Sequence, residues 1–381
     1  MKRPELCLVL AGLVLTACGT EQPAAGILDF NPPARVLERL RTERKPFVEA
    51  WSDTPSRPSF TVLQFSDLHG DAENLSRIVE FSEACAEGID EVLHTGDVVP
   101  CYWDEANPWN TVPGAARFLN TVGNHDCWKG HLVWSQTNRP YDASQEDAYS
   151  LVMAGEDPSR PFVSLWNVSQ PAGVGEPSSP HYCACYYYKD YEAPAIRLIV
   201  LDCMHYTPVQ DEWFDATLQD ALGKGLTVVA VQHYPPQPGL DKIESGFSDP
   251  DYDIPPTPGT PGLQLECMPD EAFSTADRFI SAGGTFACWL SGHLHGDMLG
   301  HVSGHLRQLH ISVDKAGEGD RYMQEDRTRG TSRQDSFNLV TVNPSRGVLF
   351  IDRIGCNRDQ YMRPKTLFCY DYINGKILLN Q

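Results

Sequence analysis

The chain has 381 residues, 41% of them hydrophobic, which is enough to bury one large core or two ordinary ones. Its formal net charge is -21 at pH 7. Nucleic acids and anionic membrane surfaces attract basic patches, so this charge argues against a nucleic-acid duplex or a membrane surface as the partner of the folded chain. A phosphate substrate would be repelled unless bound cations reversed the local field.

The first residues are typical of an export signal. Basic residues precede an apolar run at 6–15, which is shorter than the roughly 20 residues that a membrane-spanning helix needs. The run leads into Leu15-Thr16-Ala17-Cys18, which resembles a bacterial lipobox with Cys18 as the lipidated residue. We expect a lipoprotein-type signal peptide at 1–18 and a cell-envelope protein whose only membrane contact is this lipid anchor, facing the periplasm or the exterior. An ordinary secretory signal with a chance cysteine is the alternative.

The remaining cysteines do not predict a zinc knuckle. Of 12 cysteines, two lie in or at the end of the signal, which leaves 12 − 2 = 10. Cys183 and Cys185 have one residue between them and no second pair follows at zinc-knuckle spacing. In an exported chain we expect disulfides or buried thiols, and the sequence does not give their pairing.

The next elements form a βαβ unit. Residues 19–57 are predicted to be a tether and a leading helix. A strand at 60–65, a helix with one apolar face after it and a strand at 90–94 imply parallel strands with a right-handed crossover. The apolar run 118–122 supplies another strand.

The rest of the chain alternates in the same way but carries two inserts. The predicted strands lie at 195–201, 226–231 and 285–290, and the predicted helices at 210–222 and 270–282. The inserts are the aromatic and glycine-rich stretch 127–195 and the proline-rich loop 235–261; a loop as long as the second is usually functional or disordered. We expect one domain over 58–315, and strands within 316–381 that complete a second sheet.

Polar residues follow the apolar runs at five places. The first is Gly123-Asn124-His125-Asp126, which alone would predict only a turn. Ligands of open α/β sheets lie beyond the carboxyl ends of the strands, so the recurrence indicates a site. The full set is Asp67, His69, Asp97, Asn124, His125, His233, His293 and His295. Carboxylate, imidazole and amide oxygen suit zinc, manganese or iron, and so many ligands predict two ions about 3.5–4 Å apart that share a carboxylate.

These blocks resemble the calcineurin-like metallophosphoesterases. The pattern Asp-x-His, Gly-Asp, Gly-Asn-His-Asp, a lone His after a strand and Gly-His-x-His stands here in the same order. Its residues are Asp67-Leu68-His69, Gly96-Asp97, Gly123-Asn124-His125-Asp126, His233 and Gly292-His293-Leu294-His295. The resemblance covers roughly 58–315. It implies a four-layer αββα sandwich of two mixed sheets flanked by helices, whereas periodicity alone predicts only an α/β fold.

The resemblance also implies residue roles. One ion would be held by Asp67, His69 and His295, the other by Asn124, His233 and His293, and Asp97 would bridge them. The cofactors would be two divalent or trivalent ions, manganese, iron or zinc. Such ions lower the pKa of a shared water and offset charge on the phosphoryl oxygens. His125 would bind no metal and would protonate the leaving oxygen or stabilise charge on the phosphoryl group.

One departure from the family pattern leaves a role open. In the protein-phosphatase branch, an Asp three residues after Gly-Asp orients the catalytic histidine and an Arg follows it. Here Pro100 and Cys101 occupy those places, which makes a protein phosphatase a poorer match. The partner that orients His125 is therefore open, with Asp126 and Asp104 as candidates. The purple acid phosphatases, which have Gly in the place of His69, fit poorly as well.

The sequence therefore predicts an exported two-metal phosphoesterase acting on a small phosphomonoester or phosphodiester, such as a nucleotide or a sugar- or lipid-linked phosphate. The alternative is a catalytically silent surface lipoprotein of the same fold that binds a ligand or partner. A hydrolase of a non-phosphate bond has no supporting feature beyond the metals. Among the other histidines, His94 is predicted to lie in the core, and His205 with Asp202 is the pair most apt to have a special role.

Overall fold

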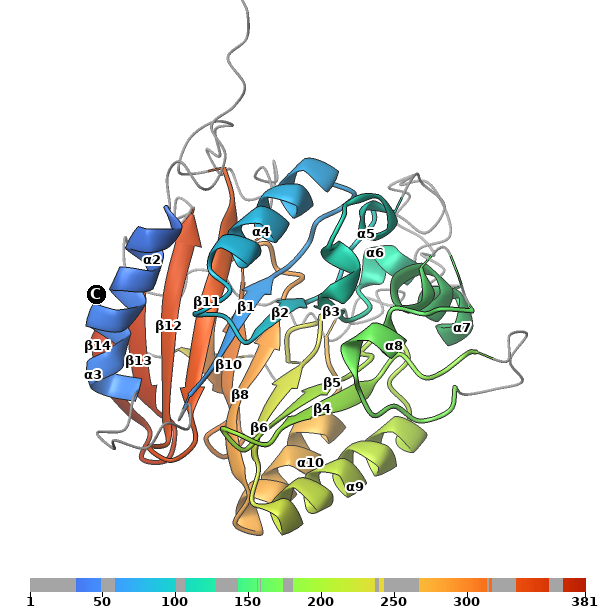
Figure 1. Ribbon diagram of the computed structural model, residues 1–381. Helices are drawn as coiled ribbons and strands as arrows, with labels where there is room; N and C mark the ends of the chain where they lie inside the picture. The colour runs from blue at the N-terminus through green and yellow to red at the C-terminus, as the bar shows by residue number, and fades with distance from the viewer. Residues whose placement is uncertain are drawn as a thin grey trace, which may run out of the picture.

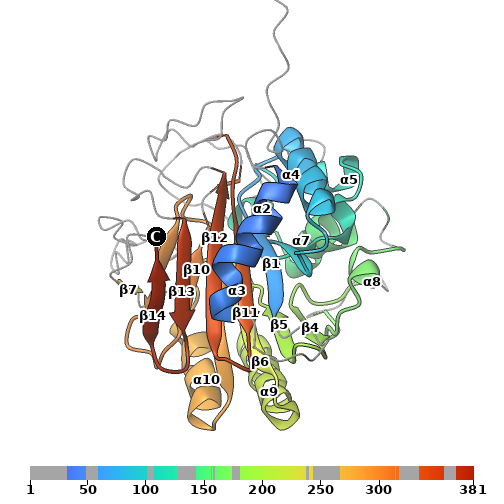
Figure 2. The same ribbon diagram turned by 60° about the vertical axis from the view of Figure 1, so that its left-hand side comes forward.

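Two seven-stranded β-sheets pack face to face, and helices cover their outer faces (Figures 1 and 2). The structure is a computed structural model that describes residues 32–48, 59–100, 107–127, 143–155, 157, 159–173, 181–236, 240–242, 267–313, 315–316, 334–355 and 366–381. The predicted signal peptide and most of the predicted tether lie outside these residues.

The first sheet combines the amino-terminal βαβ unit with the carboxy-terminal strands. Its order is β14 (Lys376–Asn380), β13 (Leu367–Asp371), β12 (Val348–Gly355), β11 (Ser336–Asn343), β1 (Phe60–Phe65), β2 (Glu91–His94) and β3 (Leu119–Asn120). Strands β1, β2 and β3 are parallel, as predicted. Strand β11 pairs antiparallel with β1, with Leu339 opposite Leu63.

The second sheet carries the middle of the chain. Its order is β4 (Tyr187–Tyr191), β5 (Ile196–Val200), β6 (Thr227–Val231), β8 (Thr285–Ser291), β10 (Leu309–Ser312), β9 (Met298–Val302) and β7 (Leu240–Lys242). Strands β5, β6, β8 and β10 are parallel, and the other three pair antiparallel. Both sheets are mixed, and the predicted four-layer sandwich is confirmed.

Helices close both outer faces. On the first sheet lie α2 (Pro33–Arg39), a π-helical turn (Leu40–Arg44), α3 (Lys45–Val48) and α4 (Ala72–Ala84) (Figure 2). On the second lie α9 (Pro208–Lys224) and α10 (Asp270–Ser281) (Figure 1). Local sequence sets their ends: Asp71 accepts a hydrogen bond from the Asn74 N–H at the start of α4, and Gly225 ends α9 in the left-handed conformation.

Short helices lie in the connections from β2 to β3 and from β3 to β4. They are α5 (Pro108–Thr111), a 3₁₀ turn (Ala115–Arg117), α6 (Asn124–Cys127), α7 (Gln145–Tyr149), a π-helical turn (Ser150–Ala154) and α8 (Val163–Trp166). Trp166 is buried and its indole N–H donates to the carbonyl of Ala116. At least this aromatic residue of the insert is therefore part of the packed interior.

The main core lies between the sheets. Phe65, Leu290 and Leu339 are fully buried in one continuous apolar cluster there. A second cluster between the second sheet and helices α9 and α10 contains Phe214 and Trp289. The second sheet thus has one apolar layer on each face. Close packing on both faces holds the ends of its strands rigidly, as a precise site requires.

The structure adds three details to the prediction. The carboxy-terminal strands lie in the same sheet as β1, because β11 pairs with β1. The aromatic insert ends in β4, an edge strand of the second sheet. The loop 235–261 contains the short strand β7, and 237–239 and 243–261 lie outside the described residues.

The described cysteines are all thiols, and Cys101 and Cys356 lie outside the described residues. No described helix is both long and apolar enough to cross a bilayer.

Candidate metal centre

The loops that follow five parallel strands meet at one place. Strand β1 leads to Asp67 and His69, β2 to Asp97, β3 to Asn124 and His125, β6 to His233, and β8 to His293 and His295. Three sets of potential ligand atoms, each within 4.8 Å of one another, are formed by Asp67, His69 and His295, by His69, Asp97 and His125, and by Asp97, His233 and His293. The structure thus brings together every carboxylate and imidazole of the predicted site.

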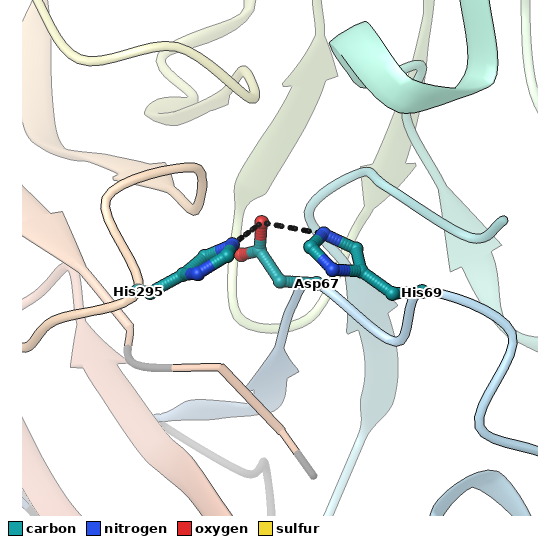
Figure 3. Close-up of side chains that lie close together, drawn as sticks. All are labelled: Asp67, His69 and His295. Atoms are coloured by element: carbon teal, nitrogen blue, oxygen red, sulfur yellow. Dashed lines mark ion pairs between the residues drawn. The ribbon is translucent and has the colours of Figure 1, made fainter. Parts of the chain in front are cut away.

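The first set brings together a loop from each sheet, since Asp67 and His69 follow β1 and His295 follows β8. Asp67 Oδ1 lies 3.3 Å from His295 Nε2 and 3.8 Å from His69 Nε2 (Figure 3). The Asp67 side chain is fully buried and its Oδ1 accepts no hydrogen bond in the described part of the chain. A buried carboxylate oxygen that faces two imidazole nitrogens is suited to binding a cation together with them.

Asp97 lies between the two predicted ligand groups. Its Oδ2 is 3.3 Å from His69 Nε2 on one side and 3.3 Å from His233 Nε2 on the other. Asn124 Oδ1 lies 3.0 Å from His233 Nε2 and 2.9 Å from His293 Nδ1. One carboxylate shared by two clusters is the arrangement that a bridging ligand requires.

The ligand loops adopt a backbone conformation that these residue types rarely take. The φ angles of Asp67, His69, Asp97, His293 and His295 are 55°, 47°, 62°, 72° and 50°. Left-handed conformations of such residues cost free energy and gather at functional sites. Sequence patterns did not reveal this feature.

Glycine is required beside these loops. A Cβ on Gly123 would lie 2.1 Å from Asp97 Oδ1, and one on Gly292 would lie 1.7 Å from Ser66 Oγ. The glycines of both motifs therefore allow the ligand loops to approach one another closely.

Hydrogen bonds on the far side of two imidazoles fix the ring orientation. The Nδ1 of His233 donates to the carbonyl of Thr95 at 2.7 Å, which turns Nε2 toward Asp97 and Asn124. The Nδ1 of His125 donates to the carbonyl of Pro100 at 2.6 Å. Such bonds are the usual way in which a protein selects the tautomer of a functional histidine.

The orienting partner of His125 was left open by the sequence. The structure shows a backbone carbonyl, that of Pro100, in this place. The carboxylate of Asp126 instead accepts hydrogen bonds from four backbone N–H groups, those of Gly123 and residues 97–99. Asp104 lies outside the described residues.

The electrostatics favour the metal-binding forms of Asp97 and His69, whereas His233 would have to lose a proton to bind an ion. Burial works against the charged form of Asp97, but the nearby imidazoles of His233 and His125 hold the pKa of its carboxyl well below the ordinary value. Burial lowers the pKa of His69 to about 3 and also lowers that of His125. For His233, burial is outweighed by the charges of Asp97 and Asp67, which raise the pKa to about 9. Deprotonated ligands are the forms that bind metal.

The residues fit two ions. Carboxylate oxygens, imidazole nitrogens and an amide oxygen are hard or borderline donors, as zinc, manganese and iron prefer. The floor is closed, since His233 is fully buried, whereas the side chains of His69, His125 and His295 are 15%, 16% and 15% exposed. A ligand approaching from solvent would thus meet these three imidazoles first.

Two other polar groups lie apart from this cluster. His94 is fully buried and its Nδ1 contacts Asn120 Oδ1 at 2.7 Å, which confirms its predicted place in the core. The Nδ1 of His205 lies 2.8 Å from Asp202 Oδ2, and its Nε2 lies 3.0 Å from the carbonyl of Ala143. This pair joins β5 to the start of α7 and is not among the potential metal ligands.

Comparison with known proteins agrees with this geometry. Residues 60–297 match the family model described as calcineurin-like phosphoesterase. No curated protein matches the chain.

Several solved structures are similar at low identity. A dimetal phosphatase from Danio rerio is 13% identical, with 79% of this chain and 97% of that chain covered and a TM-score of 0.45. A phosphopantetheinyl hydrolase from Mycobacterium tuberculosis is 14% identical, with coverage of 68% and 90% and a TM-score of 0.33. A metallophosphoesterase from Sphaerobacter thermophilus is 12% identical, with coverage of 77% and 88% and a TM-score of 0.26. The family model spans more than half of the chain and contains every candidate ligand, so the chain belongs to the calcineurin-like phosphoesterase family.

Proposed function

We propose that the protein is a dinuclear metal-dependent phosphoesterase. The observation that carries this proposal is the place of Asp97, whose Oδ2 lies 3.3 Å from an imidazole of each ligand group. Asp67, His69 and His295 would hold one ion, and Asn124, His233 and His293 the other. Manganese, iron or zinc would suit this donor set.

The chain's own residues prepare the chemistry in two ways, beside what bound ions would supply. Bound ions would supply an activated water and offset charge on the phosphoryl oxygens. The buried carboxylates of Asp67 and Asp97 provide the negative charge that retains cations. The hydrogen bond to Pro100 keeps a proton on His125 Nδ1, so the exchangeable site is Nε2, which lies 3.9 Å from Asp97 Oδ2 on the exposed side of the cluster. Because burial lowers the pKa of His125, Nε2 would first have to take up a proton, which it would then give to the leaving oxygen.

The substrate class that we propose is a small phosphomonoester or phosphodiester. The protein carries a net charge of -21, so an anionic substrate would be attracted only near bound cations. Pro100 and Cys101 occupy the places of the Asp and Arg of the protein-phosphatase pattern, which favours a small molecule over a phosphoprotein.

The experiment combines metal analysis with turnover. Elemental analysis should find two metal ions per chain, and the same sample should hydrolyse p-nitrophenyl phosphate or bis-p-nitrophenyl phosphate. The variant His125→Ala should keep its metals and lose activity about 10²- to 10⁴-fold, the range for a general acid. Replacement of the exposed His181 is the matched control and should leave activity unchanged. Two metals with no turnover of either ester would favour the silent lipoprotein.

We also propose that the protein is a bacterial lipoprotein anchored through Cys18. The proposal rests on the short apolar run and the Leu15-Thr16-Ala17-Cys18 sequence. The full chain expressed in a bacterium should incorporate labelled fatty acid and partition into detergent, and Cys18→Ser should abolish both. A native chain without label would contradict the anchor.

A further inference from the structure

We propose that Asp126 is the positioning residue of this site: its carboxylate fixes, as one unit, the backbone of Asp97 and the Pro100 carbonyl that orients His125. The effect of Asp126 on catalysis depends on the proposed function being correct. The hydrogen bonds that Asp126 accepts do not depend on which reaction the site performs.

The carboxylate of Asp126 bridges two loops. Its Oδ2 accepts the N–H of Gly123 at 2.9 Å and that of Asp97 at 3.1 Å, and its Oδ1 accepts the N–H of Val98 at 2.9 Å and that of Val99 at 3.2 Å. The side chain is fully buried. Four amide donors on one buried carboxylate join the loop after β2 to the loop after β3.

This contact determines the position of Asp97. The main chain of Asp97 is bound through its N–H to Asp126, and its side-chain Oδ1 accepts the N–H of His125 at 2.9 Å. The other side-chain oxygen, Oδ2, is left to face His69 and His233. Asp126 therefore holds the proposed bridging ligand with one oxygen directed into the site.

The same contact determines the position of the histidine. Val99, the last amide that Asp126 binds, directly precedes Pro100, whose carbonyl lies 2.6 Å from His125 Nδ1. A backbone carbonyl orients a histidine only as firmly as its loop is held. The proline ring fixes one of the two soft dihedrals at this residue, and Asp126 fixes the peptides before it.

The loop after β1 holds the opposite side of these peptides. The N–H of His69 donates to the carbonyl of Asp97 at 3.0 Å, and that of Gly70 donates to the carbonyl of Val98 at 2.8 Å. The carbonyls of residues 97 and 98 therefore bind the loop after β1, whereas the N–H groups of residues 97–99 bind Asp126. Loss of the amide contacts should loosen the 97–100 loop without releasing it, so a folded variant is expected.

Two variants separate the parts of this inference. Asp126→Asn keeps the size of the side chain but turns an NH₂ group toward two of the four N–H donors. Pro100→Gly keeps the carbonyl and the Asp126 contacts and frees the φ angle. Asp371→Asn is the matched control, because Asp371 also accepts backbone N–H groups, in the turn between β13 and β14.

Three measurements on the full zinc-loaded chain read the outcome. They are zinc affinity by competition calorimetry, the His125 Nδ1–H proton resonance in ¹⁵N-histidine-labelled protein, and kcat for aryl phosphates of graded leaving-group pKa. A thermal melt first confirms that each variant is folded.

Asp126→Asn should lower zinc affinity about 10- to 100-fold, the usual effect of removing a group that supports a ligand. It should also abolish the protected Nδ1–H resonance and reduce kcat most for esters with poor leaving groups. Pro100→Gly should affect the resonance and the leaving-group dependence but not zinc affinity. Asp371→Asn should change none of these.

A folded Asp126→Asn that keeps native zinc affinity and the Nδ1–H resonance would overturn the inference. An equal loss of kcat for all leaving groups, with the resonance intact, would show a structural role only and would also overturn it. If Asp126→Asn does not fold, an unchanged resonance in Pro100→Gly would refute the relay to His125. If the native chain hydrolyses no ester while the resonance and zinc affinity respond as expected, the proposed function fails and the positioning role stands.

Discussion

Arg353 and Asp297 form an ion pair between the two sheets, with 2.6 Å between Nη1 and Oδ2 and neither side chain exposed to solvent. Arg353 lies on β12, and Asp297 follows the loop that carries His293 and His295. The carboxy-terminal strands therefore support a loop of the metal centre from across the core.

Replacement of Arg353 by Met should destabilise the fold by about 3–5 kcal/mol, because it removes a buried cation that faces the buried carboxylate of Asp297. Urea denaturation measures this change. Arg41→Met is the matched control and should have little effect, because the Arg41–Glu87 ion pair is exposed, with 60% and 63% of the side chains accessible. The double variant with Asp297→Leu should regain much of the loss, and a single variant as stable as the native chain would contradict the structural importance of the pair.

A methyl group at Gly123 should disrupt the metal centre. The Cβ of Gly123→Ala would lie 2.1 Å from Asp97 Oδ1 and 2.3 Å from the Asp97 nitrogen, so the bridging carboxylate must move. We expect loss of bound metal in elemental analysis. Gly223→Ala is the control: a Cβ there meets nothing within 4 Å in helix α9, and alanine should stabilise the helix by up to about 1 kcal/mol. Full metal occupancy in Gly123→Ala would show that the loop tolerates the shift.

Much of this architecture could be predicted from the sequence, because it depends on local patterns. The strand–helix–strand periodicity around 60–94 and the polar residues that end each strand placed the candidate ligands at the carboxyl ends of the strands. The pairing of β11 with β1 could not be predicted, since an apolar strand carries no record of a partner far away in the chain. The role of Asp126 was hidden for a related reason, because three of its four donors are amides of another loop.

Removal of metal should lower the thermal stability of the protein. Ions that bind only the native state stabilise it by mass action, by about 2.7 kcal/mol when the free ion is at 100 times its dissociation constant. Melting should therefore shift down with chelator and recover with manganese or zinc. In Asp97→Asn this dependence should be much smaller, because Asp97 contacts both ligand groups. Unchanged melting of a chain that also carries no metal would refute the two-ion site.

His205 provides a pH-dependent contact away from the metal centre. Its two nitrogens face Asp202 Oδ2 and the carbonyl of Ala143, and because both groups only accept hydrogen bonds, both ring nitrogens must carry protons. Burial opposes this charge, but the charge and hydrogen bond of Asp202 outweigh it, with a smaller contribution from Asp147, and raise the pKa of His205 to about 9.

A histidine whose pKa is higher in the folded chain than in the unfolded chain stabilises the fold only while it is protonated. For His205 the rise is from 6.5 to about 9, so its contribution, on the order of 3 kcal/mol, should be complete below pH 6.5 and should disappear as the pH rises through 9. His205→Gln removes the charge, so the difference in unfolding free energy between native and variant chains, measured in urea, should shrink between pH 6 and pH 9.5. The pH-dependent contributions of the other titrating groups are the same in both chains and cancel in this difference. A difference that stays constant over this range would mean that His205 is neutral in the fold, and that one of its two acceptors is bound by another donor.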